Sequence, residues 1–441
     1  MPILQLFALT VMVIPSDAVI GAIGGQGYAA GLVGLFAFVA YLAAILFGLH
    51  DPLRDRHPIR SVLCLVWISV LASYIAMDRG TLTVSQGSGA DRLLLQLAVI
   101  TGVALVAAEF LTSLHDVRRV LRALTWGGAF CGVVAALQFW ISLDITPYLR
   151  ELPGFSINFD IPAIVNRGAL SRVAGTSLTA IELGVVCGML LPLAIYLAIY
   201  DTDRPARWRW APVALIALAI PTSVSRSAVI SVVLALSVLV VLMPTRQRLV
   251  AFCAAPLALA AVFMSAHGVI GTLLDFFRAG SNDDSVRARL YDYPEVERLV
   301  SQAPWLGHGG WTYLPDDPML ILDNQYLKTA IELGLIGVVV LAAFLLVPLI
   351  SALVARRRSG DPELRLLCAA LAGAALAAAG CSLTFDSLSF PMFANVYALV
   401  IGLIGACWRL AGAGKESATA RVRPGPVPGP RANRPLRAPD S

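Results

Sequence analysis

Arginine residues stand at three places where apolar segments meet polar ones. Arg172 lies in S-R-V-A-G-T, Arg226 in S-V-S-R-S-A, and Arg287 lies beside Arg289 in a long polar stretch. A guanidinium group stays charged at any physiological pH and binds phosphate oxygens through two parallel N–H bonds. We predict that these residues bind the anionic head of a lipid-tailed ligand. The alternative is that each reaches to the membrane interface, pairs with a nearby acid or lies on a solvated helix face.

Two polar residues, Asp323 and Asn324, stand directly in front of a long apolar run. A carboxylate at such a place, beside phosphate-binding arginines, can take a proton from an attacking hydroxyl group. Asp and Asn are also common helix N-caps, and both roles can hold at once. His308, in G-H-G-G, is a second candidate base. The alternative for His308 is a loop histidine that is simply exposed to solvent.

Glu182 lies near one end of an apolar run, where a lone carboxylate is costly. We expect it to pair with Arg172 or Arg226 and to belong to the same binding site. No metal motif is evident: Asp316 and Asp317 fit a solvated, Pro-flanked turn better than a divalent cation site. The seven cysteines lie in or at the ends of apolar runs, as small packing residues do. The sequence therefore predicts no metal site and no cofactor.

The chain that positions these residues is strongly apolar. Hydrophobic residues make up 58% of it, charged residues 14%, and its mean hydropathy is +0.77. In a soluble domain about a quarter of the residues are charged, so this composition predicts an integral membrane protein. The formal net charge of +5 is concentrated in short loops and the C-terminal tail. That pattern is typical of membrane topology and does not indicate nucleic-acid binding.

We predict an all-α membrane domain over residues 1–410. Each transmembrane helix needs roughly 20 apolar residues, which gives about twelve spans. The expected spans are 3–20, 28–49, 59–77, 93–111, 120–141, 178–200, 211–225, 227–243, 249–266, 329–354, 366–385 and 390–410. The seventh and eighth are short and share the polar turn around Arg226.

Basic residues alternate between the connections and set the expected orientation. The even-numbered connections carry them: Arg54, Arg56, Arg60, Arg118, Arg119, Arg122, Arg204, Arg207, Arg209, Arg246, Arg248, Arg356, Arg357, Arg358 and Arg365. We expect these connections and both termini on the cytoplasmic side. The polar segments 78–92, 142–177 and 267–328 then face outward.

The large outer loop, 267–328, lies between the expected ninth and tenth spans. Apolar residues three to four apart over 283–300 predict an amphipathic helix. Pro304 and the run W-L-G-H-G-G then form a loop, and D-N-Q-Y-L begins a new helix. We interpret this loop as an extracytoplasmic helical hairpin that carries part of a reaction centre.

The C-terminal tail, 411–441, is rich in proline and basic residues. It has too little apolar surface to fold, so we expect it to be disordered on the cytoplasmic side. Its charge can hold it near anionic membrane lipids; the alternative is a solvated tail without function.

These motifs resemble those of the O-antigen ligase and polymerase family of bacterial envelope enzymes, the Wzy/WaaL-type superfamily. R-V-A-G-T-S at 172–177 resembles the family's Arg-x-x-Gly-Thr element, and S-R-S-A at 225–228 resembles its Ser-Arg element. P-W-L-G-H-G at 304–309, followed by D-N-Q-Y-L-K-T-A-I-E-L-G-L-I-G at 323–337, resembles the end of its large loop. The likeness covers about 167–347, and the order, spacing and placement of the motifs make it specific.

The resemblance implies a metal-independent, inverting glycosyltransferase of the bacterial cytoplasmic membrane. Such enzymes move a glycan from a polyprenyl-diphosphate carrier to a hydroxyl of an acceptor glycan or lipid at the outer face. It implies a diphosphate-binding role for Arg172, Arg226 and Arg287, and it puts Asp323 where many ligases carry the His proposed as base. Glu182 resembles an acidic position of some members, whereas a Pro common soon after the Gly-Thr element is missing. A ligase and a polymerase both fit.

Two other interpretations stay open. A multi-spanning transporter of an anionic solute or lipid-linked glycan would also explain many spans and outer arginines. Transporters, however, usually carry internal repeats and a binding site near the membrane midplane, and neither is evident in the sequence. A peptidoglycan-polymerising membrane transferase would share the lipid-diphosphate chemistry and differ in the sugar.

Overall fold

The computed structural model describes most of the chain. The described residues are 2–21, 27–53, 56–78, 80, 82–151, 153–158, 162–167, 170–249, 284–315, 317 and 320–422. Within helices and strands, the side chains of 166–167, 170, 284–292 and 413–422 are outside this set. The predicted ninth span, 249–266, lies outside the described residues except for Leu249. So do the first part of the large loop and the tail beyond Val422.

The fold is mostly helical, as predicted. In the described part, eight helices are long and apolar enough to cross a membrane. They are α2 (Ala29–Leu46), α3 (Pro58–Ala76), α4 (Val84–Phe110), α5 (Leu114–Ala136) with its π-helical continuation η2 (Leu137–Ile141), α7 (Ala180–Tyr200), α13 (Gln325–Arg358), α14 (Pro362–Cys381) and α15 (Pro391–Val422). Three shorter helices are α1 (Pro2–Val13), α8 (Ala206–Thr222) and α9 (Arg226–Leu242). An all-α membrane protein is therefore supported, and the number of twelve spans stays a prediction.

Helix starts follow the local capping chemistry. Thr83 and Gln86 form a capping box that starts α4, while Ser113 caps α5. Asp361 caps α14, and Pro362 occupies its first turn. The capping box extends α4 into the segment 78–92, which we predicted to be a polar connection. At the other end of the chain, α15 continues past the predicted start of the tail at 411.

Four short strands were not predicted. β1 (Ala18–Ile20) pairs antiparallel with β2 (Phe155–Ile157), and β3 (Ile164–Arg167) pairs antiparallel with β4 (Leu170–Val173). Each strand has three or four residues, too few for the alternation that identifies a strand in a sequence. Three of them lie in the segment 142–177, which therefore folds into small sheets together with the short helix α6 (Thr146–Arg150).

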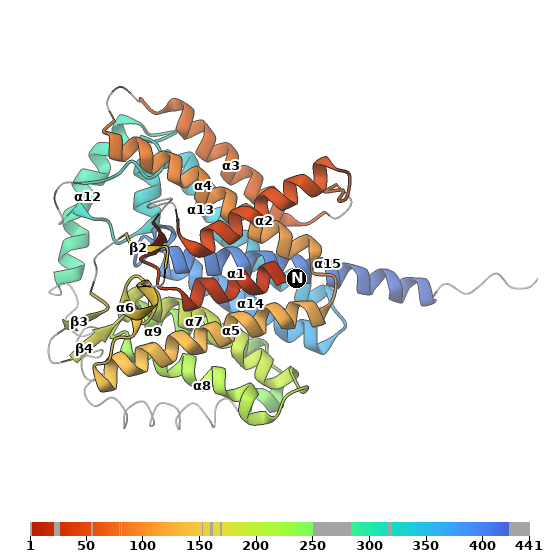
Figure 1. Cartoon of the computed structure of the whole chain (residues 1–441). Coiled ribbons are helices and arrows are strands. Elements are labelled where there is room, and N and C mark those ends of the chain that lie inside the picture. The colour runs from red at the N-terminus through yellow and green to blue at the C-terminus, as the bar shows by residue number, and fades with distance from the viewer. Residues whose placement is uncertain are drawn as a thin grey trace, which may run out of the picture.

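The connections gather at two opposite ends of the helix bundle (Figure 1). At one end lie β2, β3, β4, α6 and α12 (Asp284–Gln302); from the other end the last turns of α15 project. We call the first the loop end, which holds the described parts of 77–83, 142–179, 223–225, 303–324 and 382–390. The second is the basic end, which holds 47–57, 111–113, 201–205, 243–249 and 359–361.

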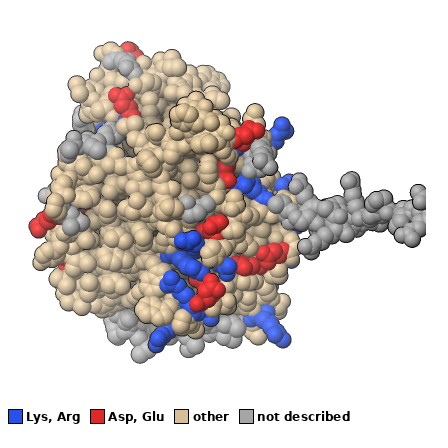
Figure 2. Space-filling model, turned by 45° about the vertical axis from the view of Figure 1, so that its right-hand side comes forward, with Lys and Arg blue, Asp and Glu red and all other residues tan. Residues whose placement is uncertain are grey.

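The arginine-rich connections are joined to one another at the basic end. The Arg118 side chain lies 3.6 Å from Glu363, and the Arg356 Nη2 atom donates to the Leu242 carbonyl at 2.9 Å. On the face in Figure 2, most charged side chains gather near the tail, while the rest of the surface is largely uncharged. This segregation is what a protein with an apolar belt and one basic aqueous face requires.

The centre of the bundle is formed by α7, α14 and α15, the most buried of the candidate spans. Small residues allow this close packing. A Cβ atom on Gly373 of α14 would lie 2.3 Å from the Ala235 carbonyl oxygen of α9, and one on Gly402 of α15 would lie 2.7 Å from the Ala104 carbonyl oxygen of α4. These contacts bring α14 close to α9, and α15 close to α4.

Helix α13 is interrupted at Gly334, where φ is 67° and ψ is −170°. Only glycine adopts this conformation without strain. The W-L-G-H-G loop replaces the missing helical hydrogen bonds: the Leu335 N–H donates to the Pro304 carbonyl at 2.8 Å, and the His308 N–H donates to the Ile331 carbonyl at 3.0 Å. The loop motif and the helix break are thus two halves of one structure.

Candidate active site at the loop end

Two of the predicted arginine motifs meet at the loop end. Arg172 lies on β4, and its Nε atom donates to the carbonyl oxygen of Ser223 at 3.1 Å. Ser223 ends α8, and Arg226 is the first residue of α9, three positions later. The structure therefore brings together two arginine motifs that are about fifty residues apart in the sequence.

The Gly-Thr element after Arg172 holds β4 in place. Gly175 has φ of 61°, a backbone conformation that favours glycine. Its N–H donates to the Gln138 side chain at 2.8 Å, and the Gln138 Nε2 atom donates back to the Gly175 carbonyl at 3.2 Å. The Thr176 hydroxyl donates to the Met12 carbonyl at 2.7 Å. The motif thus anchors the strand that carries Arg172 to α1 and η2.

The turn before Arg226 is strained. Val224 is fully buried and has φ of 41°, which a β-branched residue rarely adopts. Such outliers persist where the surrounding structure enforces them, and they concentrate at functional sites. Here the strained residue lies between Ser223, the partner of Arg172, and Arg226.

Helix N-termini converge on the same region. The ends of α9, α13 and α14 are linked, since the Cys381 thiol donates to the Ser227 carbonyl at 3.5 Å and the Gln325 N–H donates to the Ser382 carbonyl at 2.9 Å. Helices α9 and α13 both begin here, and so do α7 and α15. The N-terminus of a helix carries a partial positive charge and the C-terminus a partial negative one. Because α8 and α14 end in this region, its helix ends contribute partial charges of both signs.

Glu182 does not form the expected ion pair. Its side chain is fully buried and accepts hydrogen bonds from the backbone N–H groups of Leu178 at 2.7 Å and Phe393 at 2.9 Å. Thr179 caps the same helix through the Glu182 N–H. We predicted that this carboxylate pairs with Arg172 or Arg226. It instead accepts hydrogen bonds from N–H groups at the starts of α7 and α15, which have no partner within their own helices. Glu182 thus joins two helix N-termini.

Of the two candidate N-caps, the structure uses Asn324. Its Oδ1 atom accepts from the N–H groups of Tyr326 at 2.9 Å and Leu327 at 3.3 Å. Asp323 precedes the cap and is half-buried, next to the buried Leu322. The capping role therefore falls to Asn324, and the predicted base is a different residue from the cap.

His308 holds the loop to its neighbours. Its Nε2 atom makes a 2.9 Å hydrogen bond with the Leu299 carbonyl near the end of α12. Because a carbonyl oxygen only accepts, Nε2 carries the hydrogen, and Nδ1 is the one nitrogen able to take a proton. The half-buried ring is neither simply exposed, as in one of our expectations, nor free at both nitrogens.

The predicted amphipathic helix is α12, which packs on the first turns of α13 through Val296 and Ile331. Arg287 and Arg289 lie on this helix, but their side chains are outside the described set, and so is Asp316. Asp317 is exposed. No cluster of His, Cys, Asp or Glu suited to a metal ion occurs among the residues that the structure describes.

Other arginines at the loop end are paired with carboxylates. The Arg150 Nε atom donates to Asp17 at 3.0 Å, and burial raises the pKa of this carboxyl although Arg150 opposes the shift. Arg298 on α12 donates to Glu295 at 2.8 Å and lowers the pKa of that carboxyl. These two ion pairs fasten local structure.

Sequence analysis missed Lys328 and Asp386. The Lys328 Nζ atom lies 3.1 Å from Asp386 Oδ2 and 2.8 Å from the Ser389 hydroxyl, between α13 and the turn before α15. Lys328 follows the Asn324 cap by four residues, so the sequence already places it one turn inside the helix, on the same face as the cap. That position could have marked it as a candidate site residue.

The comparisons with known proteins agree with the motifs. Residues 211–342 match the family model of the O-antigen ligase domain. The matched stretch includes Arg226, His308, Asp323 and Asn324, while Arg172 precedes it. No curated protein matches the chain. The family match confirms the resemblance seen in the sequence and supports a place for this chain in the O-antigen ligase and polymerase superfamily.

Proposed function

We propose that the protein is a membrane glycosyltransferase that takes a glycan from a polyprenyl-diphosphate carrier and joins it to an acceptor hydroxyl. The loop end would face the outside of the bacterial cytoplasmic membrane, with both termini and the basic end inside. The single observation that carries the proposal is the hydrogen bond from Arg172 to the Ser223 carbonyl, because it unites the Arg172 motif with the turn before Arg226. The O-antigen ligase domain over 211–342 supports it.

The reaction follows from where charge develops. The acceptor oxygen attacks C1 of the donor sugar and inverts it, the bond from C1 to the phosphate oxygen breaks, and the diphosphate stays on the lipid. Asp323 takes the proton from the acceptor hydroxyl. Arg172 and Arg226, with Arg287 and Arg289 as further candidates, bind the phosphate oxygens as they gain negative charge.

The test is a transfer assay with purified full-length protein and a lipid-diphosphate-linked glycan. Arg172→Lys and Arg226→Lys each lower the rate on the order of 100-fold, because a single ammonium group does not replace the planar guanidinium. Arg298→Lys is the matched control, since Arg298 pairs with Glu295 on the exposed face of α12. A normal rate from either of the first two variants, with unchanged thermal unfolding, overturns the phosphate role.

A transporter is the second candidate, and the break in α13 favours it because transporters often build their sites from discontinuous helices. Flux of a lipid-linked glycan or anionic solute into vesicles containing the protein, without glycan transfer, would replace the enzyme proposal. If the protein is an enzyme, the glycans of a strain that lacks it identify the class of acceptor. Single glycan repeats in place of long chains indicate a polymerase, and accumulated lipid-linked polymer indicates a ligase.

A further inference from the structure

A small cavity lies beside the break in α13. It has a volume of about 80 Å³ and is bounded by α3, α4 and α13. Its walls are mainly apolar, but five polar side chains line it: Ser69, Gln96, Gln325, Thr329 and Glu332. By its volume it has room for a few water molecules. The cavity therefore places polar side chains between candidate membrane spans, where apolar neighbours cannot form hydrogen bonds with them.

Three polar atoms of residues that line the cavity have no hydrogen-bond partner among the described residues: Glu332 Oε1, Ser69 Oγ and Gln96 Nε2. The exposed fraction is 4% for Glu332 and 3% for Ser69. Gln325, by contrast, is satisfied, since it donates to Thr329 Oγ1 at 3.2 Å and accepts from the Leu388 N–H at 2.8 Å. Buried polar atoms without partners are rare and costly. Three of them around one cavity indicate that a polar species occupies it.

The backbone at Glu332 is held firmly. Its carbonyl oxygen accepts from the Ser73 hydroxyl at 3.0 Å and from the Gly309 N–H at 2.9 Å. The break two residues later, at Gly334, fits against the loop, because a Cβ there would lie 2.4 Å from the Trp305 carbonyl group. The backbone of Glu332 is thus held by the same loop that completes α13.

The charges around Glu332 do not balance. The charged groups that act on it are Lys328, one turn away on α13, and Asp386. Lys328 is itself bound to Asp386. The cavity residues from α3 and α4 are neutral, and the loop contributes backbone N–H groups of Trp311 and Tyr313. His308 in that loop directs its Nε2 atom to the Leu299 carbonyl.

One ammonium group and two carboxylates leave a net negative charge when Glu332 is ionised. Such a charge is expensive within the apolar part of a membrane protein unless a positive charge joins it. We propose that the cavity beside Glu332 is a binding site for one monovalent positive charge, either a proton on the carboxyl group or an alkali cation with its water. The Gln96 Nε2 atom donates to the bound water, and the Ser69 hydroxyl oxygen can bond either the water or the cation. This inference does not depend on the proposed glycosyl transfer.

Dicyclohexylcarbodiimide, a membrane-soluble reagent, tests the site in the full-length protein in detergent. It reacts with a protonated carboxyl group: the O–H adds across one C=N bond, and the adduct rearranges to a stable N-acylurea that retains the whole reagent. Peptide mass mapping locates the modified residue. We expect labelling at Glu332 that falls at least about tenfold as the pH is raised and the carboxyl group loses its proton. Glu109, equally buried but hydrogen-bonded at both oxygens, is the internal control and stays unlabelled.

Salt separates the two sources of the charge. At fixed pH and ionic strength, labelling is compared in sodium, potassium and choline chloride. Slower labelling in sodium or potassium identifies an alkali cation, and equal labelling in all three identifies a proton; either result supports the proposal. Absence of labelling at Glu332 at every pH overturns it, and so does labelling of Glu332 that is independent of both pH and salt. The Glu332→Gln variant removes the adduct. If that variant fails to fold, peptide mapping of the labelled protein with its natural sequence still tests the proposal.

Discussion

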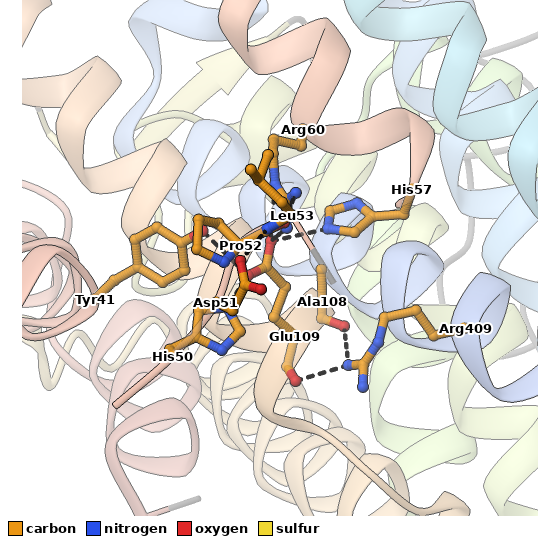
Figure 3. Close-up of polar contacts among 10 residues, drawn as sticks. All are labelled: Tyr41, His50, Asp51, Pro52, Leu53, His57, Arg60, Ala108, Glu109 and Arg409. Atoms are coloured by element: carbon orange, nitrogen blue, oxygen red, sulfur yellow. Dashed lines mark hydrogen bonds and ion pairs between the residues drawn. The ribbon is translucent and has the colours of Figure 1, made fainter. Parts of the chain in front are cut away.

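Two buried carboxylates at opposite ends of the bundle, Glu109 and Glu332, have the same exposed fraction of 4% and opposite surroundings. Figure 3 shows side chains converging on Glu109 from α2, α3 and the connection between them. Tyr41 and His50 bond to its Oε2 atom, and His57 and Arg60 bond to its Oε1 atom. Glu332 lines a cavity, and one of its carboxylate oxygens has no hydrogen-bond partner within the described part of the chain.

The difference distinguishes a buried carboxylate that stabilises the fold, Glu109, from one that can bind a ligand, Glu332. The four donors around Glu109 tie the 47–57 connection to the end of α4, and Arg409 of α15 adds hydrogen bonds to the Ala108 and Glu109 carbonyls. Both oxygens of the Glu109 carboxylate are thus hydrogen-bonded, and such a network makes a fold rigid. Glu332 instead has a carboxylate oxygen that accepts no hydrogen bond from the described residues. Burying such an oxygen costs free energy unless a ligand binds it.

The largest effect is expected from removing the satisfied carboxylate. Glu109→Ala leaves the buried His57 and the partly buried His50 and Arg60 without their shared carboxylate, and we expect it to lower the free energy of unfolding by about 3–5 kcal/mol. Denaturant unfolding of the detergent-solubilised protein measures this. The control is Asp203→Ala, which removes the exposed partner of Arg122 and costs about 0–1 kcal/mol. Equal effects of the two variants would contradict the structural role of Glu109.

Removing a carboxylate that acts on the substrate should lower the transfer rate and leave the stability of the fold nearly unchanged. We expect Asp323→Ala to lower the transfer rate on the order of 100-fold with little change in thermal unfolding, because Asn324 supplies the helix cap. His308→Ala should lower the rate less and the stability more, since it removes the contact with Leu299. Rates and melting temperatures of both variants are measured together. A greater loss of transfer from His308→Ala would move the proton acceptor to His308.

The smallest effect is expected at the unsatisfied carboxylate. Glu332→Gln keeps the side-chain shape and removes a negative charge, so the free energy of unfolding should change by no more than about 1 kcal/mol. Glu109→Gln, the matched substitution, should destabilise the protein clearly more, because it removes the charge that Arg60 and two histidines surround. Denaturant unfolding of both variants compares them. Equal destabilisation would erase the contrast between the two sites.

Patterns carried by neighbouring residues were predictable from the sequence. The amphipathic spacing gave α12, and the polar residues before the apolar run gave the start of α13 with its Asn324 cap. The arginine-rich connections lie together at one end, apart from the connections of the loop end, as their alternation along the sequence indicated. The arginine motifs at Arg172 and Arg226 were identified as separate elements, and their contact through Ser223 depends on the fold.

Features decided by tertiary contacts were not predictable. The break at Gly334 requires the Pro304–Gly309 loop as its partner, and in sequence the glycine looks like an ordinary residue of an apolar helix. The expected ion pair of Glu182 was wrong because the N–H groups of Leu178 and Phe393 reach its carboxylate in the folded chain. Two strands that pair over more than a hundred residues, β1 and β2, leave no local pattern.

The most direct test of the central claim is equilibrium binding of a short-chain polyprenyl diphosphate, compared with its monophosphate, to the purified full-length protein. We predict that the diphosphate binds more tightly and that Arg172→Lys and Arg226→Lys each weaken its binding at least about tenfold, because each would remove a proposed bidentate phosphate contact. Binding of the monophosphate should change less. Unchanged affinity for the diphosphate in both variants, with intact folding, would contradict the assignment of these two arginines to the diphosphate site.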